Sequence, residues 1–303
     1  MSGLKEIRRR ISSVASTKQI TKAMKLVSAA KLRKVQELVH SGRYFAFKLG
    51  NIVLNSVEDI KRSGKEFTHQ LLEHRKNPSN ARIIVLGSDR GLCGGYNINL
   101  FKAIDVELHK RRSLKFEFVL FGKQSVNIAQ RFGYKVVRQY VDLPDQPHLI
   151  PIDELTHEII SDFVNGKCDK VYICYTKFHS VVNQKVVIEK ILPLSLLKMA
   201  LSEDAKKKRT ETTSEISTRG ILYSPGPQEI LAAVLPIMLT VLIKQAIIEA
   251  KTSEHAARMT AMDSATRNAD ELIDQLKLFY NRARQSAITA ELLDVLGGAN
   301  AVK

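Results

Sequence analysis

The stretch "AMDSATRNADELIDQLKLFYNRARQSAITAELLDVL" (261–296) decides the fold class, because small or apolar residues recur along it every three or four positions. This spacing is typical of one face of an α-helix, and neither glycine nor proline interrupts it. A helix from about 228 to 296 would be roughly 100 Å long, which exceeds a compact domain of this chain. We therefore predict a long helix with a narrow seam for a partner helix. The seam positions are Met262, Ala265, Ala269, Leu272, Leu276, Phe279, Ala283, Ser286, Ala290 and Leu293.

The partner helix is predicted at the other end of the chain, in residues 1–57. Apolar residues there step by three and four, and the pattern continues after a slip. They are Leu4, Ile7, Ile11, Val14, Ile20, Met24, Val27, Val35 and Leu38. We expect helix 1–57 to pair with helix 228–303 as an antiparallel coiled coil. Because Pro236 would remove a hydrogen bond from a helix interior, the continuous C-terminal helix is predicted to begin near 237.

An α/β pattern lies between the two helices, over residues 78–200. Strand-like runs "ARIIVLGS", "KFEFVLFG", "YKVVRQYVDL" and "DKVYICYTKF" alternate with helical segments near 98–112, 122–132 and 152–165. Such alternation predicts a mainly parallel, open, Rossmann-like sheet, and "NQKVVIEKILPL" (183–194) could add an edge hairpin. Residues 202–220 are polar and are predicted to form a loop. The predicted fold class is therefore α/β, with a sheet domain inserted into a long coiled coil.

The net charge of +16 is concentrated near the N-terminus, because residues 1–48 hold twelve Lys or Arg and only two acidic residues. Such a segment attracts nucleic acid, anionic lipid or an acidic protein surface. The three cysteines, Cys93, Cys168 and Cys174, have no CxxC spacing, which favours a reducing compartment over disulfides or a zinc site. We also expect no apolar run near the roughly 20 residues that span a bilayer, and the start lacks a signal peptide. The chain is predicted to be soluble or peripheral.

The glycine-rich run "GSDRGLCGGYN" (87–97) follows a predicted strand and raises the question of phosphate binding. Neither GxxxxGK[ST] nor GxGxxG is present, so the glycines are interpreted as a tight turn between strand and helix. The scattered histidines form no HExxH motif, and Cys93 is interpreted as a buried thiol. We predict no catalytic residue, no cofactor and no metal, and hence a chain that is not itself an enzyme.

Three segments together resemble the gamma subunit of F-type ATP synthase: "KEIRRRISSVASTKQITKAMKLVSAAKLRK" (5–34), the glycine run, and "SEHAARMTAMDSATRNADELIDQL…YNRARQSAITAELLDVLGGANAV" (253–302). The resemblance implies a rotor shaft, one copy per complex, inside a ring of alpha and beta subunits. It implies that the sheet domain joins the epsilon subunit and the membrane c ring. Ion flow would turn the shaft and drive ATP synthesis, while the chain hydrolyses nothing itself. It also implies a peripheral position on the cytoplasmic face of a bacterial inner membrane.

The resemblance also implies coupling residues. Lys22 and Met24 match a "TKAM" segment near an acidic loop of the beta subunit, and Arg284 and Gln285 match an "RQ" pair that engages a beta subunit. Further polar matches are Arg258, Thr289 and Glu291. The tip "LLDVLGGANAV" would sit in an apolar collar of the ring. Tyr223 lies in the region of epsilon or c-ring contact, where Ser224 departs from the acidic residue usual in the family.

Three other hypotheses are open from the residues alone. A basic coiled-coil protein that binds nucleic acid would account for the charge, and a nucleotide-dependent enzyme would use the glycine run. The exposed seam of an isolated shaft could also drive self-association.

Overall fold

The computed structural model describes residues 2–64, 67–146, 149–195 and 226–301. The chain divides into two compact units. We call Met1–Ala30 with Arg258–Lys303 the coiled-coil unit, and Lys31–Ala257 the sheet unit. Helices α1 (Ser2–Arg62) and α7 (Pro227–Ala301) contribute to both units. The predicted loop 202–220, Tyr223 and Ser224 lie outside the described residues.

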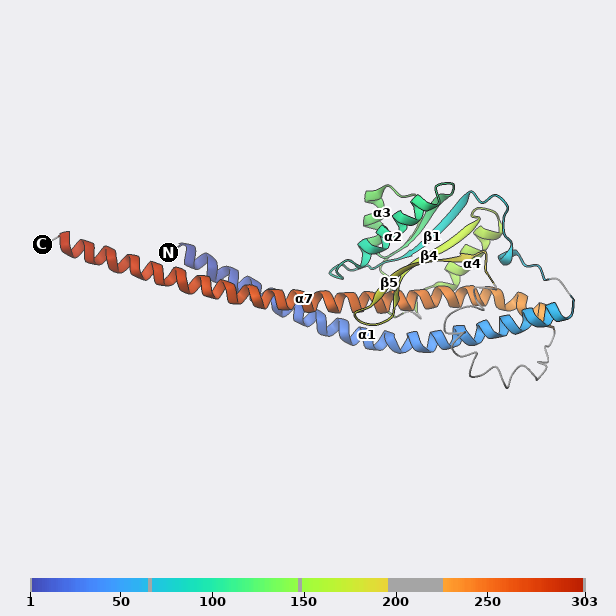
Figure 1. Ribbon diagram of the computed structural model, residues 1–303, viewed down its shortest axis with the longest axis horizontal. Helices are drawn as coiled ribbons and strands as arrows, with labels where there is room; N and C mark the ends of the chain where they lie inside the picture. Colours follow the sequence, from blue (N-terminus) through green and yellow to red (C-terminus); the bar gives the residue numbers. More distant parts are fainter. Residues whose placement is uncertain (1, 65–66, 147–148, 196–225, 302–303) are drawn as a thin grey trace. The chain divides into compact units, whose positions relative to one another are not determined.

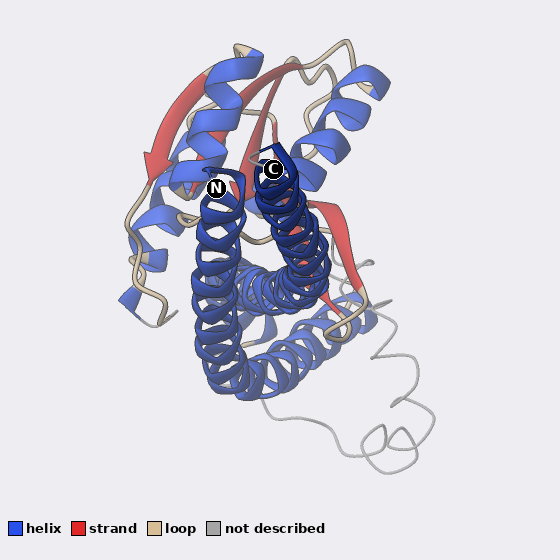
Figure 2. Cartoon of the chain, turned by 90° about the vertical axis from the view of Figure 1, so that its left-hand side faces the viewer, coloured by secondary structure: helices blue, strands red, loops and turns tan. Residues whose placement is uncertain are grey.

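In the coiled-coil unit, α1 and α7 run antiparallel and side by side (Figures 1 and 2). The seam of α1 follows an unbroken heptad pattern, so the slip expected after Val14 is wrong. Ile20 and Val27 are 58% and 56% exposed, and the seam instead carries polar side chains. These seam residues are Lys18, Thr21, Lys25 and Ser28. The apolar pattern misled the prediction because polar residues that pair across the seam can replace apolar ones there.

The predicted seam of α7 is wrong by one position at Leu272, Phe279 and Ser286, whereas the predicted seam residues Leu276 and Ala283 are partly buried. Leu272 and Phe279 are exposed, whereas Ile273 is buried and Tyr280 is partly buried. The structural seam passes through Met262, Thr266, Ala269, Ile273, Leu276, Tyr280, Ala283 and Ala287. These positions keep the alternating spacing of three and four that a left-handed coiled coil requires.

The sheet unit contains one five-stranded sheet in the order β3-β2-β1-β4-β5. Its strands are β1 (Asn80–Leu86), β2 (Lys115–Phe121), β3 (Val136–Tyr140), β4 (Lys170–Phe178) and β5 (Gln184–Leu192). The first four pair in parallel, while β5 pairs antiparallel with β4 as the predicted edge hairpin. Together with the long terminal helices, this sheet confirms the predicted fold class.

Helices cover both faces of the sheet (Figures 1 and 2). On one face, α2 (Tyr96–Lys110) and α3 (Lys123–Phe132) pack on Ile83 and Val85. On the other, α4 (Ile152–Val164) packs with α1 and α7 on Ile84 and Leu86. The short 3-10 helix η1 (Gln70–Leu72) adds Leu71 to the second core. Because both faces are buried, the central strands are continuously apolar, as expected for parallel strands.

Helix α7 begins at Pro227 and continues through Pro236, so the predicted start near 237 is wrong. Pro236 removes one backbone hydrogen bond, but Leu231, Leu235 and Leu239 bury this part of α7 in the core. Burying three leucine side chains is worth several kcal/mol, which exceeds the roughly 3 kcal/mol cost of an interior proline.

The expectation of no long apolar run also needs correction. Over Pro227–Leu293, α7 contains a window with mean hydropathy 2.2, long and apolar enough by composition to cross a membrane. Of that window, 39% is buried inside the protein. The core contacts of Leu235, Leu239 and Ile243 against the sheet explain this apolar character.

A cluster of polar residues stabilises the edge of the sheet at which the parallel strands begin. Asp169, just before β4, accepts hydrogen bonds from Arg75 (2.7 Å) and from the backbone N–H groups of Ser79 (2.8 Å) and Asn80 (2.9 Å). Burial alone would raise the pKa of Asp169, but these hydrogen bonds outweigh it and lower the pKa to about 2. The charged carboxylate therefore stabilises the fold.

We expect Asp169→Asn to lower the free energy of unfolding of the sheet unit by about 2 kcal/mol at pH 7. The pKa of Asp169 is depressed in the folded state, so this stabilisation is present above about pH 4 and is lost as the pH falls toward about 2. Urea unfolding followed by circular dichroism across this pH range measures the difference. Exposed Glu73→Gln is the control, with a change below about 0.5 kcal/mol. A difference that persists at pH 2 would contradict the prediction.

Candidate functional site

Three polar pairs lie across the seam of the coiled-coil unit. Lys25 contacts Asp263 at 2.5 Å, and the hydroxyl groups of Thr21 and Thr266 are 2.8 Å apart. One turn further, Lys18 pairs with Asp270. Hydrogen bonding to Lys25 lowers the pKa of Asp263. Each of these residues finds its partner on the other helix only when the two helices are aligned in this way. The contacts therefore fix the antiparallel register of the two helices.

The predicted coupling residues fall into two groups on this unit. Lys22 and Met24 lie beside the polar pairs, with Lys22 exposed and Met24 half-buried. The second group consists of exposed α7 side chains. They are Arg284, Gln285, Thr289 and Glu291. The register places Thr266 opposite Thr21, so the two groups are roughly 30 Å apart along the helix axis. They do not form one site.

Arg258 differs from the other predicted coupling residues, because only 7% of it is exposed.

The end of α7 has no α1 residue opposite it. Thr21 faces Thr266, so the first residues of α1 lie opposite positions near 285, and α7 continues to Ala301 (Figure 1). Beyond that point α7 exposes apolar side chains. They include Ile288, Leu292, Leu293, Val295 and Leu296. Gln285 and Thr289 line a shallow hollow on the same stretch, and Thr289 Oγ1 donates to the carbonyl of Gln285.

The glycine run connects β1 to α2 and is held by its own side chains. Asn97 Oδ1 accepts from the backbone N–H of Ser88 (3.0 Å), and Asn97 Nδ2 donates to Ser88 Oγ (2.8 Å). Cys93 is buried beside both residues, which confirms its interpretation as a buried thiol. The run is therefore the tight turn that the sequence predicted.

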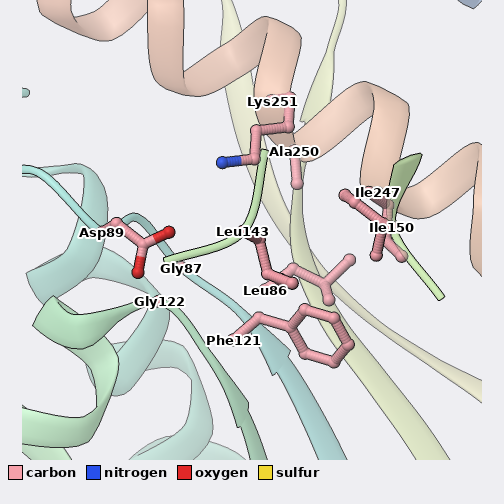
Figure 3. A pocket seen from close by; sticks show the side chains of 10 residues that line it. All are labelled: Leu86, Gly87, Asp89, Phe121, Gly122, Leu143, Ile150, Ile247, Ala250 and Lys251. Carbon is pink, nitrogen blue, oxygen red and sulfur yellow. The ribbon is translucent and has the colours of Figure 1, made fainter. Parts of the chain in front are cut away.

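A carboxylate of the glycine run accepts hydrogen bonds from the backbone of two other segments. Asp89 Oδ1 accepts from the backbone N–H groups of Lys123 and Asp142, both at 3.0 Å, and so caps the N-terminus of α3. Figure 3 shows the adjoining pocket, whose lining is apolar apart from Asp89 and Lys251. A phosphate placed there would face a carboxylate that already holds these amides.

The residues that the structure describes contain no group of three or more His, Cys, Asp or Glu side chains able to hold a metal ion. All three cysteines are buried. Burial raises the pKa of Cys168 to about 11 and raises that of Cys174 further, so neither thiol is a reactive thiolate near neutral pH.

The family model described as ATP synthase matches residues 3–302. A curated ATP synthase gamma chain from Moorella thermoacetica is 35% identical over 303 residues, covering all of both chains. The chain belongs to the ATP synthase gamma-chain family. A second gamma chain, from Synechococcus elongatus, is 38% identical over 317 residues and is covered to 99%. Relatives of the gamma-chain family thus match both helical ends and the sheet together.

Chains of solved ATP synthase structures share the fold of this chain. A chain of the Euglena gracilis mitochondrial ATP synthase, in a structure of OSCP, F1 and c-ring, aligns with a TM-score of 0.64. It is 18% identical, and the alignment covers 99% of this chain and 95% of that one. A chain from the Tetrahymena thermophila central stalk and c-ring aligns with a TM-score of 0.57 at 21% identity, covering 81% and 99%.

Sequence reasoning missed the polar pairs of the seam. A continuous spacing of three and four from Leu4 through Lys18, Lys25 and Val39 would have found them, had polar residues been allowed in the pattern. The acidic partners Asp263 and Asp270 are likewise spaced by seven, which keeps them on one face of α7.

Proposed function

We propose that this chain is the rotor of an ATP synthase, the central-stalk subunit that couples ion flow through the c ring to ATP synthesis or hydrolysis. Its partners are the alpha and beta subunits, the epsilon subunit and the c ring, with one copy in each complex. It is peripheral to the membrane, on the cytoplasmic face of a bacterial inner membrane. Nucleic acid is not among its partners.

The observation that carries this proposal is the unpartnered end of α7. Leu292, Leu293 and Leu296 are exposed on one helix with no α1 residue facing them. An exposed apolar surface of this kind marks a binding site for another protein. A surrounding ring would cover it from all sides, whereas a nucleic acid would not.

Two features support a role without catalysis. The glycine run lacks the GxxxxGK[ST] and GxGxxG patterns, and Asp89 places a carboxylate at the N-terminus of α3, which opposes anion binding at that helix end. The polar groups Arg284, Gln285 and Thr289 are exposed on a single helix, which suits them to contact a partner rather than to enclose a substrate.

A native purification tests the proposal, with an affinity tag in the predicted loop 202–220. The eluate from solubilised membranes is resolved by subunit mass and assayed for magnesium-dependent ATP hydrolysis. We expect three alpha and three beta subunits for each tagged chain, together with ATPase activity. Recovery of the chain alone or with nucleic acid would overturn the proposal.

Replacing Arg284 and Gln285 together by alanine is expected to lower ATP hydrolysis by the assembled complex at least about tenfold. The change removes a bidentate cation and an amide, whose hydrogen bonds to a partner are worth about 1–3 kcal/mol each. Steady-state hydrolysis by the purified complex measures the effect. Lys277→Ala, on an exposed part of the same helix, is the control and should leave the rate unchanged. Equal rates for the two variants would contradict the assignment.

Met24→Lys is expected to impair coupling more than hydrolysis. The added ammonium would lie beside Lys22 and Lys25 and could form a misplaced ion pair with an acidic partner loop. The measurement is the ratio of ATP-driven proton pumping to ATP hydrolysis in membrane vesicles, which should fall several-fold. Met24→Leu keeps the side chain neutral and should preserve the ratio. If both variants pump normally, Met24 is only a packing residue of the seam.

A further inference from the structure

The edge of the sheet where the parallel strands begin forms a surface distinct from the glycine run. Strand β2 begins at Lys115, which pairs with Asn80, and β4 begins at Lys170, which pairs with Ala81. Lys115 and Lys170 therefore flank β1 at the same edge. The helices that precede β2, β3 and β4 also end here, because each returns the chain to the start of a parallel strand. We call this surface the amino edge.

Three carboxylates of the amino edge are paired with cations. Glu117 and Asp162 both pair with Arg82, and Asp169 pairs with Arg75. Lys135 and Lys167 add second cations to Glu117 and Asp162, respectively. Each of these three carboxylates therefore has at least one cation of its own.

Six further cations of the amino edge have no ion-pair partner among the residues that the structure describes. They are Lys76, Lys110, Arg112, Lys115, Arg131 and Lys170. The three helix C-termini at this edge contribute about half a negative charge each. These dipoles offset only part of the surplus, so the amino edge is strongly positive.

An exposed aromatic side chain lies among these cations. Phe132, the last residue of α3 and the neighbour of Arg131, is 60% exposed. Its ring stacks on Tyr134 and Phe101, with centroid distances of 5.7 and 6.5 Å, which limits its motion. A fixed, exposed aromatic ring beside basic side chains is typical of surfaces that bind the membrane interface.

Two residues of the long helices lie at the carboxyl ends of the strands, on the opposite side of the sheet from the amino edge. Helix α1 enters this unit at Lys31, which pairs with Asp145 in the segment after the carboxyl end of β3. Lys251 of α7 lines the pocket at the carboxyl ends of β1 and β2. These two contacts of the long helices lie at the carboxyl ends of the strands, opposite the amino edge.

We propose that the amino edge binds an anionic phospholipid surface, with Lys110, Arg112, Lys115 and Lys170 facing the headgroups and Phe132 at the interface. Juxtamembrane Lys and Arg each gain about 1 kcal/mol near an anionic leaflet. The proposed function includes a peripheral association with the membrane, and this inference names the surface that makes the contact. In that respect it rests on the proposed function. Vesicle binding needs no catalytic ring, so failure of the rotor proposal and failure of this one are distinguishable.

The test is co-sedimentation of the full chain with vesicles of phosphatidylcholine alone or mixed with phosphatidylglycerol. The edge variant replaces Lys110, Arg112, Lys115 and Lys170 by glutamine. The control variant removes four exposed α1 cations by replacing Lys5, Arg8, Arg9 and Arg33 with glutamine. Both variants lose the same charge, so a general effect of net charge lowers their binding equally. Circular dichroism verifies that both are folded.

We expect the partition coefficient onto anionic vesicles to fall at least about tenfold in the edge variant and less than about threefold in the control. Phe132→Ala should also weaken vesicle binding several-fold. Equal losses in the two charge variants, or equal binding to vesicles without phosphatidylglycerol, would overturn the proposal. If Phe132→Ala has no effect and polyglutamate displaces the chain from vesicles, the edge is a site for an acidic protein, and the lipid proposal is wrong.

Discussion

Gly122→Ala is expected to prevent the sheet unit from folding, with a loss of more than about 4 kcal/mol. Gly122 has a φ of +87°, a conformation that side chains other than glycine rarely adopt. A Cβ atom added there would lie 2.5 Å from the backbone carbon and oxygen of Ser88. Ser88 cannot move aside, because it is fully buried and its carbonyl accepts from the N–H of Gln124.

Gly133→Ala is the matched control for this prediction. Gly133 has a φ of +69° and ends α3, but an added Cβ would contact nothing within 4 Å. The control therefore isolates the backbone cost, about 1 kcal/mol, from the clash. Soluble expression and thermal unfolding by circular dichroism compare the two variants. Similar melting temperatures would show that the backbone of Ser88, after β1, moves easily away from Gly122, after β2.

The sheet could be predicted from the sequence because its signals are local. Apolar runs such as "ARIIVLGS" are buried on both faces, and short helical segments separate them. Parallel order follows from this alternation, and the hairpin follows from the short spacing between Phe178 and Gln184. Each step uses residues that are close together in the chain.

The details of the coiled coil could not be predicted, because they depend on which residues meet across about 245 positions of sequence. A threonine or lysine appears to be a surface residue when either helix is considered alone. Thr21 and Thr266 can occupy the seam because their hydroxyl groups hydrogen-bond to each other. Ile20 and Val27 attracted the prediction because they are apolar, although the structure exposes them. The predicted helix start near 237 was wrong for a related reason. Burial of the leucines near Pro236 outweighs the free-energy cost of a proline inside the helix.

The role of Asp89 was also out of reach of the sequence. The carboxylate caps α3, which begins 34 residues later, and holds Asp142 as well. No sequence motif within the glycine run predicts these hydrogen bonds of Asp89. The absence of a Walker or dinucleotide pattern argued against phosphate binding, and the structure adds that Asp89 places a carboxylate at the N-terminus of α3.

Arg43→Met is expected to destabilise the sheet unit by about 3 kcal/mol. Arg43 of α1 donates to Glu249 of α7 (3.0 Å) and to the carbonyl of Phe178 at the end of β4 (2.8 Å). Glu249 is only 3% exposed, and the pair joins three elements of this unit. Removing the guanidinium leaves a buried carboxylate with one remaining donor, Gln245 at 3.1 Å.

A double-mutant cycle separates the ion pair from the packing of the arginine side chain. Adding Glu249→Gln to Arg43→Met should restore at least half of the lost stability, because the buried group is then neutral. Arg62→Met, which breaks an exposed pair with Asp59 on the same helix, is the control and should cost less than about 0.5 kcal/mol. Urea unfolding monitored by circular dichroism measures the wild type, Arg43→Met, Glu249→Gln, the double variant and the Arg62→Met control. If the double variant is as unstable as Arg43→Met alone, the loss comes from packing, and the buried charge of Glu249 does not depend on Arg43.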